Sequence, residues 1–148
     1  MNDTQPAVTI ERLIPAPPRT VFEAWLDAES LRCFMCPDPG TRVTKAECEA
    51  RVGGAFLIMM NVGGRDLPHH GEYLEIERYT RLAFTWLSDS AGEGSRVTLH
   101  FAESPDGNTN LTLVHHGLSD AGAREGHRKG WSHILSVLAS WHDLGTHG

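Results

Sequence analysis

The sequence predicts an α+β fold in which a curved antiparallel sheet of seven strands wraps around a long C-terminal helix, with two short helices after the first strand. Apolar residues alternate with a period of two between residues 42 and 116, and the connections there are too short for parallel neighbours. The C-terminal stretch then takes a helical period. The chain has 148 residues, the size of one domain, so we expect a single domain over residues 1–148.

The N-terminal part reads as one strand followed by two short helices. We expect the first strand at Val8–Ile14, because the prolines that follow it interrupt a strand. Pro17-Pro18 suits a helix start, and the apolar residues of Val21–Leu26 recur at helical spacing. Asp27 breaks or re-caps this segment, and Glu29–Phe34 forms the second helix.

The middle of the chain contains turn residues between short alternating runs. Gly53-Gly54, Gly63-Gly64 and Pro105-Asp106-Gly107 are typical of tight connections. Alternation indicates that one face of the sheet is buried and the other is wet. We read His69-His70 as a solvated polar loop. The six further strands are expected at Arg42–Ala50, Ala55–Val62, His70–Glu77, Arg81–Ser88, Ser95–Ala102 and Asn108–His116.

The last part of the chain predicts one long helix from about Asp120 to Leu144, with Ser119 as its N-cap. At 1.5 Å per residue it would be roughly 36 Å long, enough to cross the sheet. A strand, two short helices, six strands and a covering helix make a helix-grip architecture. The apolar stripe that faces the sheet consists of Trp131, Ile134, Leu135, Leu138 and Trp141.

Three glycines, Gly122, Gly126 and Gly130, fall four residues apart in the first half of this helix. Each interior glycine costs a helix about 1 kcal/mol relative to alanine. Either the missing side chains leave room for the sheet or a ligand, or residues 120–128 are partly loop and the helix starts later.

Aromatic and histidine side chains on the inward faces are the candidate lining of a pocket. Aromatic faces would supply contact area, and His115, His127 and Tyr73 would orient a polar group. One side chain of Met59-Met60 must also point inward. The candidate ligand-binding residues are Phe56, Tyr73, Phe84, Trp86, Phe101, His115, His127 and Trp131.

His115 and His127 are also the only candidates for catalysis. The strand alternation places His115 inward, and the helical period places His127 on the face of Trp131. A pair of histidines near Glu72 or Tyr73 could act as acid and base. No nucleophile turn, metalloprotease motif, phosphate loop or dinucleotide fingerprint accompanies them. We therefore expect no cofactor, and enzymatic activity is the less favoured interpretation.

The cysteines do not predict a metal or redox site. Cys33 and Cys36 form a C-x-x-C, but Pro37–Gly40 follows where a redox motif would open a helix. Zinc would need more ligands than Cys48 and scattered histidines provide. We interpret the pair as half-buried residues near a helix end.

Charge and composition narrow the partners and the compartment. Net charge is −6, with 13 Lys+Arg against 19 Asp+Glu, so a nucleic-acid partner is not expected. No apolar run spans a bilayer, and the first residues lack a signal peptide. We expect a cytoplasmic protein without membrane insertion.

An ordered set of short motifs resembles the SRPBCC (START/Bet v-like) superfamily. Within it the chain is most similar to the family named after the C-terminal domain of the activator of the heat-shock-protein-90 ATPase. It departs from that family at Phe34-Met35-Cys36-Pro37, where a tryptophan-rich piece is usual. The matching motifs are Val8–Arg12, Ala16-Pro17, Val21–Trp25, Arg51–Gly54, Gly71–Ile76, Leu82–Trp86, His115–Gly117 and Gly130-Trp131.

The resemblance implies a pocket between the long helix and the sheet, and it leaves three functions open. The first is binding of a small hydrophobic or amphipathic ligand without catalysis. The second is a polyketide cyclase or hydrolase that uses a pocket histidine. The third is a chaperone-associated interaction module, or a homodimer formed through a sheet edge or the helix that carries Trp25. The co-chaperone's separate N-terminal domain has no counterpart in the chain, which argues against a chaperone-activating role.

Overall fold

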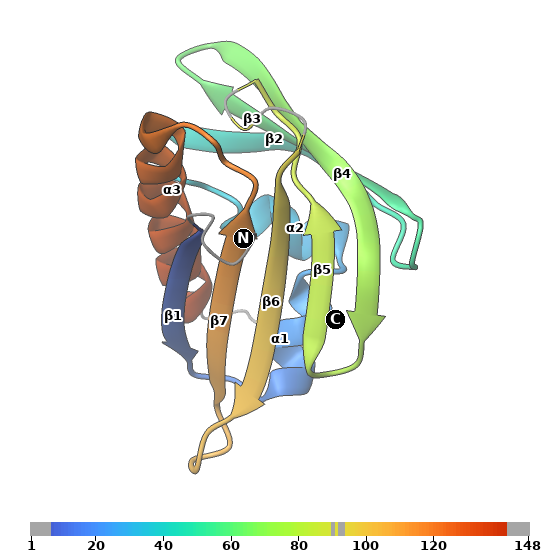
Figure 1. Cartoon of the computed structure of the whole chain (residues 1–148). Helices are drawn as coiled ribbons and strands as arrows, with labels where there is room; N and C mark the ends of the chain where they lie inside the picture. The colour runs from blue at the N-terminus through green and yellow to red at the C-terminus, as the bar shows by residue number, and fades with distance from the viewer. Residues whose placement is uncertain (1–6, 90, 92–93, 142–148) are drawn as a thin grey trace.

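The computed structural model describes residues 7–89, 91 and 94–141, and it confirms the predicted α+β helix-grip fold (Figure 1). The two short helices follow the first strand, and the long helix comes last. In chain order the elements are β1 (Val8–Ile14), α1 (Pro18–Ala24), α2 (Ala28–Phe34), β2 (Thr41–Cys48), β3 (Ala55–Val62), β4 (Arg65–Glu77), β5 (Arg81–Thr85), β6 (Arg96–Glu103), β7 (Thr109–His116) and α3 (Ala121–Ser140).

The seven strands form one antiparallel sheet in the order β1-β7-β6-β5-β4-β3-β2. β1 pairs with β7, so the first and last strands of the chain are neighbours, and β1 and β2 are the two edges. The register shifts between Val43 and Lys45 in β2 and between Tyr73 and Glu75 in β4. Such irregularities bend a sheet, and all three helices lie on one face of this curved sheet (Figure 1).

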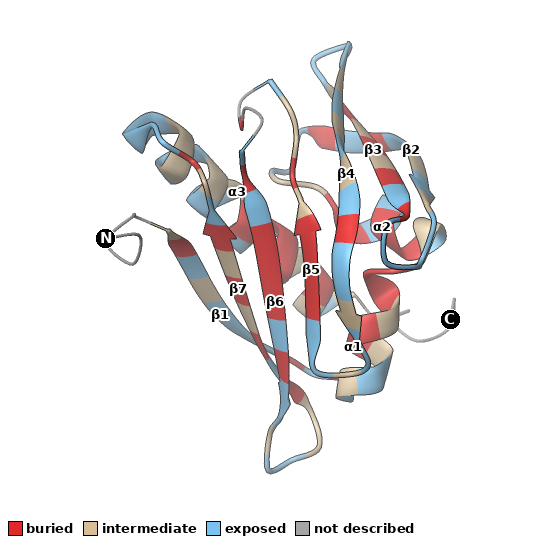
Figure 2. Ribbon diagram, turned by 45° about the vertical axis from the view of Figure 1, so that its right-hand side comes forward, coloured by how far each residue is buried: buried red, intermediate tan, exposed pale blue. Residues whose placement is uncertain are grey.

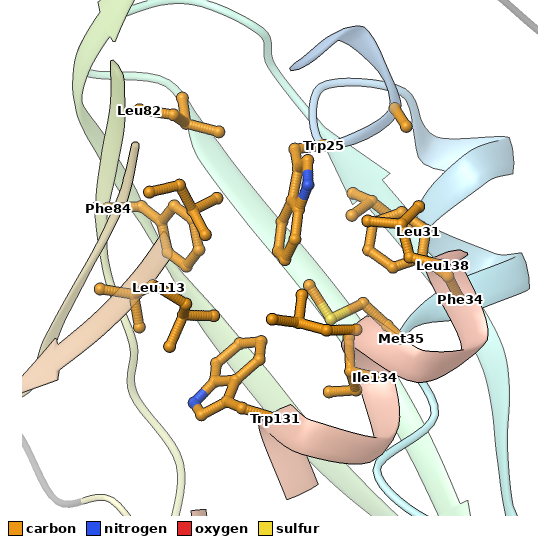
Figure 3. Close-up of a cluster of buried hydrophobic side chains, with 14 of the residues drawn as sticks. Trp25, Leu31, Phe34, Met35, Leu82, Phe84, Leu113, Trp131, Ile134 and Leu138 are labelled. Atoms are coloured by element: carbon orange, nitrogen blue, oxygen red, sulfur yellow. The ribbon is translucent and has the colours of Figure 1, made fainter. Parts of the chain in front are cut away.

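The core fills the space between the helices and that face of the sheet. Burial alternates along the strands (Figure 2), as in β7, where Leu111, Leu113 and His115 are buried. Figure 3 shows side chains from α3 and the short helices meeting those of the sheet, with Trp131 and Trp25 among them. Four members of the predicted α3 stripe are buried, namely Trp131, Ile134, Leu135 and Leu138. The fifth, Trp141, follows the end of the helix and is half-buried.

Trp25 belongs to this core and not to the surface. It caps the end of α1, it is 2% exposed, and its ring lies 5.0 Å from that of Phe34. The Trp25 side chain therefore packs inside the molecule against Phe34, Phe84 and Trp131. A homodimer through a sheet edge or this helix stays a prediction.

The helix ends follow local hydrogen bonding. Asp27 is the N-cap of α2 and accepts from the backbone N–H of Ser30 at 3.0 Å. The N-cap of α3 is Asp120 and not Ser119, because the Asp120 carboxylate accepts from the N–H of Ala123 at 2.9 Å. α3 ends at Ser140, and the predicted extension to Leu144 lies outside the described residues. Within the described chain, no helix is long and apolar enough to cross a membrane.

The β3–β4 hairpin is longer than the sequence predicted, and this corrects the reading of His69-His70 as a loop. Gly63 and Gly64 have φ of +59° and +86°, which lets a tight turn place Arg65 opposite Val62. β4 therefore begins at Arg65, and both histidines lie in the strand. β5 is shorter than predicted and ends at Thr85, so Trp86 lies just beyond it.

Candidate functional site

A cavity of about 290 Å³ lies between the N-terminal half of α3 and the sheet. It is roofed by α3 and floored by side chains from β3, β4 and the residue after β5. The lining residues are Pro37, Met60, His69, Trp86, Gly122, Ala123, Gly126, His127, Gly130, Trp131 and Ile134.

The three spaced glycines lie inside α3, so the interpretation of residues 120–128 as partly loop was wrong. All three line the cavity. A Cβ built on Gly126 would meet nothing within 4 Å, whereas one on Gly130 would lie 3.2 Å from Cβ of Pro37. A Cβ on Gly122 would lie 3.0 Å from a carboxylate oxygen of Asp120. The missing side chain at Gly126 therefore leaves open space beside the helix, and Gly130 permits close contact with the segment after α2.

Two tryptophans form the aromatic wall of the cavity. The rings of Trp86 and Trp131 lie 4.8 Å apart at 55°, and both side chains are almost fully buried. Trp131 projects from α3. Trp86 follows β5 directly and stays joined to the sheet, since its N–H donates to the carbonyl oxygen of Ser95 at 3.0 Å. Met60 is the inward member of its methionine pair, since Met59 is only half-buried.

His115 lies behind this wall and is held by Trp131. The indole Nε1–H of Trp131 donates to Nδ1 of His115 at 2.9 Å. An accepting Nδ1 requires the hydrogen on Nε2, which is buried without a partner among the described residues. Burial, and then the neighbouring His127 and His116, lowers the pKa of His115 to about 3. His115 is therefore neutral, and both nitrogens are unsuited to act as a base.

His127 contacts His115 and faces the cavity. The two rings lie 5.0 Å apart in an edge-to-face arrangement, so the structure brings the two predicted histidines together. Nδ1 of His127 lies 2.8 Å from the carbonyl oxygen of Ala123, one turn earlier in α3. This bond orients the ring and leaves Nε2 for other contacts. Glu72, a suggested third member, is exposed.

His69 is a cavity residue that the sequence reasoning missed. Its Nδ1 bonds the carbonyl oxygen of Leu67 at 3.0 Å, and its ring lies 5.3 Å from that of Trp86. Burial lowers the pKa of His69, and the bond to Leu67 offsets part of this effect. The signal was present in the alternation of His69 and Tyr73, which share one face once β4 is extended to Arg65.

Four of the other predicted residues lie outside this cavity. Phe56, Tyr73 and Phe84 surround a space of about 10 Å³, which is packed core. The Tyr73 hydroxyl donates to the carbonyl oxygen of Trp25 at 3.4 Å, and burial raises the pKa of Tyr73. Phe101 packs against Phe22, with ring centroids 4.9 Å apart. Trp86, His127 and Trp131 line the cavity, and His115 supports it from behind.

The cysteines lie away from the cavity wall. Cys33 is exposed on α2 and Cys36 is half-buried just after it, and burial raises the pKa of Cys36. A raised thiol pKa lowers the thiolate fraction that redox chemistry requires. In residues 7–89, 91 and 94–141, no three His, Cys, Asp or Glu side chains gather as metal ligands do.

An antiparallel sheet that grips a C-terminal helix, with a cavity between them, defines the helix-grip class of the SRPBCC superfamily. The family model described as Activator of Hsp90 ATPase homolog 1-like protein (AHSA1) matches residues 15–143. The chain belongs to this family, as its motifs suggested.

Solved structures share this fold. Protein CV1439 from Chromobacterium violaceum is 29% identical, with a TM-score of 0.79 over 91% of this chain and 96% of its own. The AHSA1-like protein from Aeromonas hydrophila is 24% identical, with a TM-score of 0.75 over 90% of each chain. Protein MLL2253 from Mesorhizobium loti is 24% identical, with a TM-score of 0.73 over 95% of this chain and 98% of its own. No curated protein matches this chain in sequence.

Proposed function

We propose that this protein binds a small hydrophobic or amphipathic molecule in the cavity between α3 and the sheet. The observation that carries the proposal is the cavity of about 290 Å³ between the sheet and the N-terminal half of α3, beside the exposed Gly126, where a Cβ would meet nothing within 4 Å. This glycine costs the helix about 1 kcal/mol relative to alanine. Because a Cβ at Gly126 would touch nothing, tight packing does not explain that glycine, whereas a ligand would.

The size of the cavity limits the ligand. Pockets for small molecules run from about 300 to 1,000 Å³, and this cavity lies at the lower end. It suits a molecule of one or two rings, whose flat faces can pack on Trp86 and Trp131. A long acyl chain would exceed the space.

Calorimetry and thermal unfolding with naphthalene-sized probes test this proposal. We expect 2-naphthol to bind and to raise the unfolding temperature, since a ligand at 100 times its Kd stabilises the folded state by about 2.7 kcal/mol. Gly126→Leu places a side chain in the open space and should abolish binding. Ser132→Leu adds the same side chain at an exposed position of α3 and should not.

Two results would contradict the proposal. One is the absence of any stabilisation by neutral two-ring probes in a correctly folded protein. The other is binding that persists undiminished in Gly126→Leu, because the ligand would then occupy another part of the molecule. Shifts of the Trp131 indole resonance in ¹H–¹⁵N spectra would place the probe independently.

One geometric observation, the orientation of the His127 ring, favours the cyclase or hydrolase interpretation. Its Nδ1 is bound to Ala123, so Nε2 of the neutral ring keeps a lone pair that could accept a substrate proton. We expect any turnover of p-nitrophenyl acetate above background to be lost in His127→Ala while 2-naphthol still binds. Equal hydrolysis by wild type and His127→Ala would remove this support.

A further inference from the structure

Backbone carbonyl groups determine which ring nitrogen carries the hydrogen in the two histidines of the cavity. Nδ1 of His69 and Nδ1 of His127 each lie within 3.0 Å of a carbonyl oxygen, from Leu67 and Ala123. A carbonyl oxygen only accepts, so each Nδ1 carries a hydrogen, and each Nε2 of the neutral ring keeps a lone pair. No described residue donates to either Nε2. The cavity therefore holds two hydrogen-bond acceptors.

The same wall offers no accessible side-chain donor in the part of the chain that the structure describes. The indole N–H of Trp131 is used by Nδ1 of His115 at 2.9 Å. The indole N–H of Trp86 has no partner among the described residues, but it is fully buried and is not exposed to the cavity. The Nδ1 hydrogens of both histidines are used by carbonyl oxygens. A ligand that only accepts hydrogen bonds would find no donor on these side chains.

The wall also lacks formal charge. None of the described residues that line the cavity is an Asp, Glu, Lys or Arg. Burying an ionised group without a partner costs far more than burying a neutral one. A carboxylate or an ammonium group would lose hydration here and gain no counter-charge while the histidines are neutral.

We propose, on the basis of the function proposed above, that the cavity selects neutral, flat molecules that carry a hydroxyl group, with His69 or His127 accepting the hydroxyl hydrogen at Nε2. The ligand class is that of phenols and naphthols. Ethers and carboxylates of the same ring system bind less tightly, because they lack the donated hydrogen bond or bring a charge.

Three probes on one ring system test this selectivity at pH 8, namely 2-naphthol, 2-methoxynaphthalene and 2-naphthoate. A net hydrogen bond contributes about 0.5–1.5 kcal/mol, so we expect calorimetry to show 2-naphthol binding about 2- to 13-fold more tightly than its methyl ether. The double variant His69→Phe/His127→Phe keeps two flat rings and removes both acceptors. It should bind the two probes about equally.

A control variant and a second readout keep the test independent of folding. His133→Phe changes a half-buried histidine of α3 that does not line the cavity, and it should keep the preference. Long-range ¹H–¹⁵N spectra of the wild type should show Nδ1–H tautomers for His69 and His127. 2-Naphthol should shift an Nε2 resonance of one of them, and 2-methoxynaphthalene should not.

Lowering the pH should reverse the preference. The titratable groups near the His69 ring are His127 of α3, His70 of the same strand and Asp89, which follows β5. Protonation turns Nε2 from acceptor to donor and adds positive charge, so 2-naphthol should bind less tightly and 2-naphthoate more tightly as the pH falls from 8 to 5. Burial lowers the pKa of His69, so its ring takes up a proton only at a lower pH than an exposed histidine does.

The possible outcomes distinguish a failure of this selectivity from a failure of the proposed ligand-binding function. Equal affinity of wild type for 2-naphthol and its methyl ether would overturn the selectivity and leave the ligand-binding proposal standing. A preference that survives in the double variant would overturn the role of the two histidines. Failure of all three probes to bind would overturn both proposals.

Discussion

At the residue scale, the buried His115 shows how a polar group is accommodated in an apolar core. It is 1% exposed, and one of its nitrogens is paired with the indole of Trp131. The other nitrogen has no partner among the described residues, so adding a proton would place a charge where water does not reach. The side chain is therefore held neutral, which couples the stability of the fold to pH.

We predict that this coupling appears between pH 6.5 and about 3. Folding lowers the pKa of His115 from 6.5 to about 3, so the unfolded state binds the proton first as the pH falls. Its contribution is fully present above pH 6.5 and is lost at up to about 1.4 kcal/mol per pH unit below it. His115→Gln should flatten the pH dependence of the free energy of unfolding, measured with urea. His116→Gln, at the exposed next position, should not; equal slopes in all three proteins would contradict the prediction.

Gly117 is a residue whose backbone conformation excludes a side chain. Its φ is +88°, and a Cβ there would clash with the carbonyl oxygen of Gly94. We predict that Gly117→Ala lowers the free energy of unfolding by more than about 1 kcal/mol. Gly107→Ala, with a φ of +83° but open space around it, separates the cost of the conformation from that of the contact. An equal loss in both variants would show that the contact with Gly94 contributes nothing.

At the element scale, the short helix α2 depends on its N-cap. Asp27 accepts hydrogen bonds from both the backbone N–H and the hydroxyl of Ser30, at 3.0 and 2.8 Å. A helix of seven residues has little intrinsic stability, so this cap and the buried face hold it. Asp27→Ala should cost about 0.5–2 kcal/mol in urea unfolding, whereas Asp27→Asn should retain most of the stability. Equal losses in the two variants would contradict the capping role.

The long helix α3 is weakened by its own glycines, and this weakness is testable. A Cβ on Gly126 would meet nothing within 4 Å, so Gly126→Ala should raise the free energy of unfolding by about 0.5–1 kcal/mol. Gly130→Ala should gain less, because its Cβ would lie 3.2 Å from Pro37. A loss of stability in Gly126→Ala would mean that the space beside it is filled in the folded protein.

At the scale of the whole molecule, one core joins all the elements. Trp25 from α1 lies 6.4 Å from Trp131 of α3, which lies 4.8 Å from Trp86 beside the sheet. No part of this core can be lost without exposing the rest. We therefore predict a single unfolding transition, with coincident curves from tryptophan fluorescence and far-UV circular dichroism. A separate early transition in either signal would contradict this.

The sequence by itself determined the order and type of the elements. The alternation of β7 and the α3 stripe are local patterns, since each indicates which side of one segment faces water. The turn glycines are local too, because each marks a connection between neighbouring strands. The alternation of β7 also predicted that His115 points inward. The prediction for His69 was wrong because the strand was expected to begin at His70, whereas β4 begins at Arg65 and places His69 on the same face as Tyr73.

Tertiary structure alone decided which inward residues meet. Phe56, Tyr73 and Phe84 share the inward face with Trp86, yet they fill solid core while Trp86 borders the cavity. The difference arises because different residues of α3 lie opposite them. Which residues lie there depends on the curvature of the sheet and the position of the helix, and many contacts between distant parts of the chain set both. Periodicity reports the face of a segment, whereas a cavity depends on the distance between two faces.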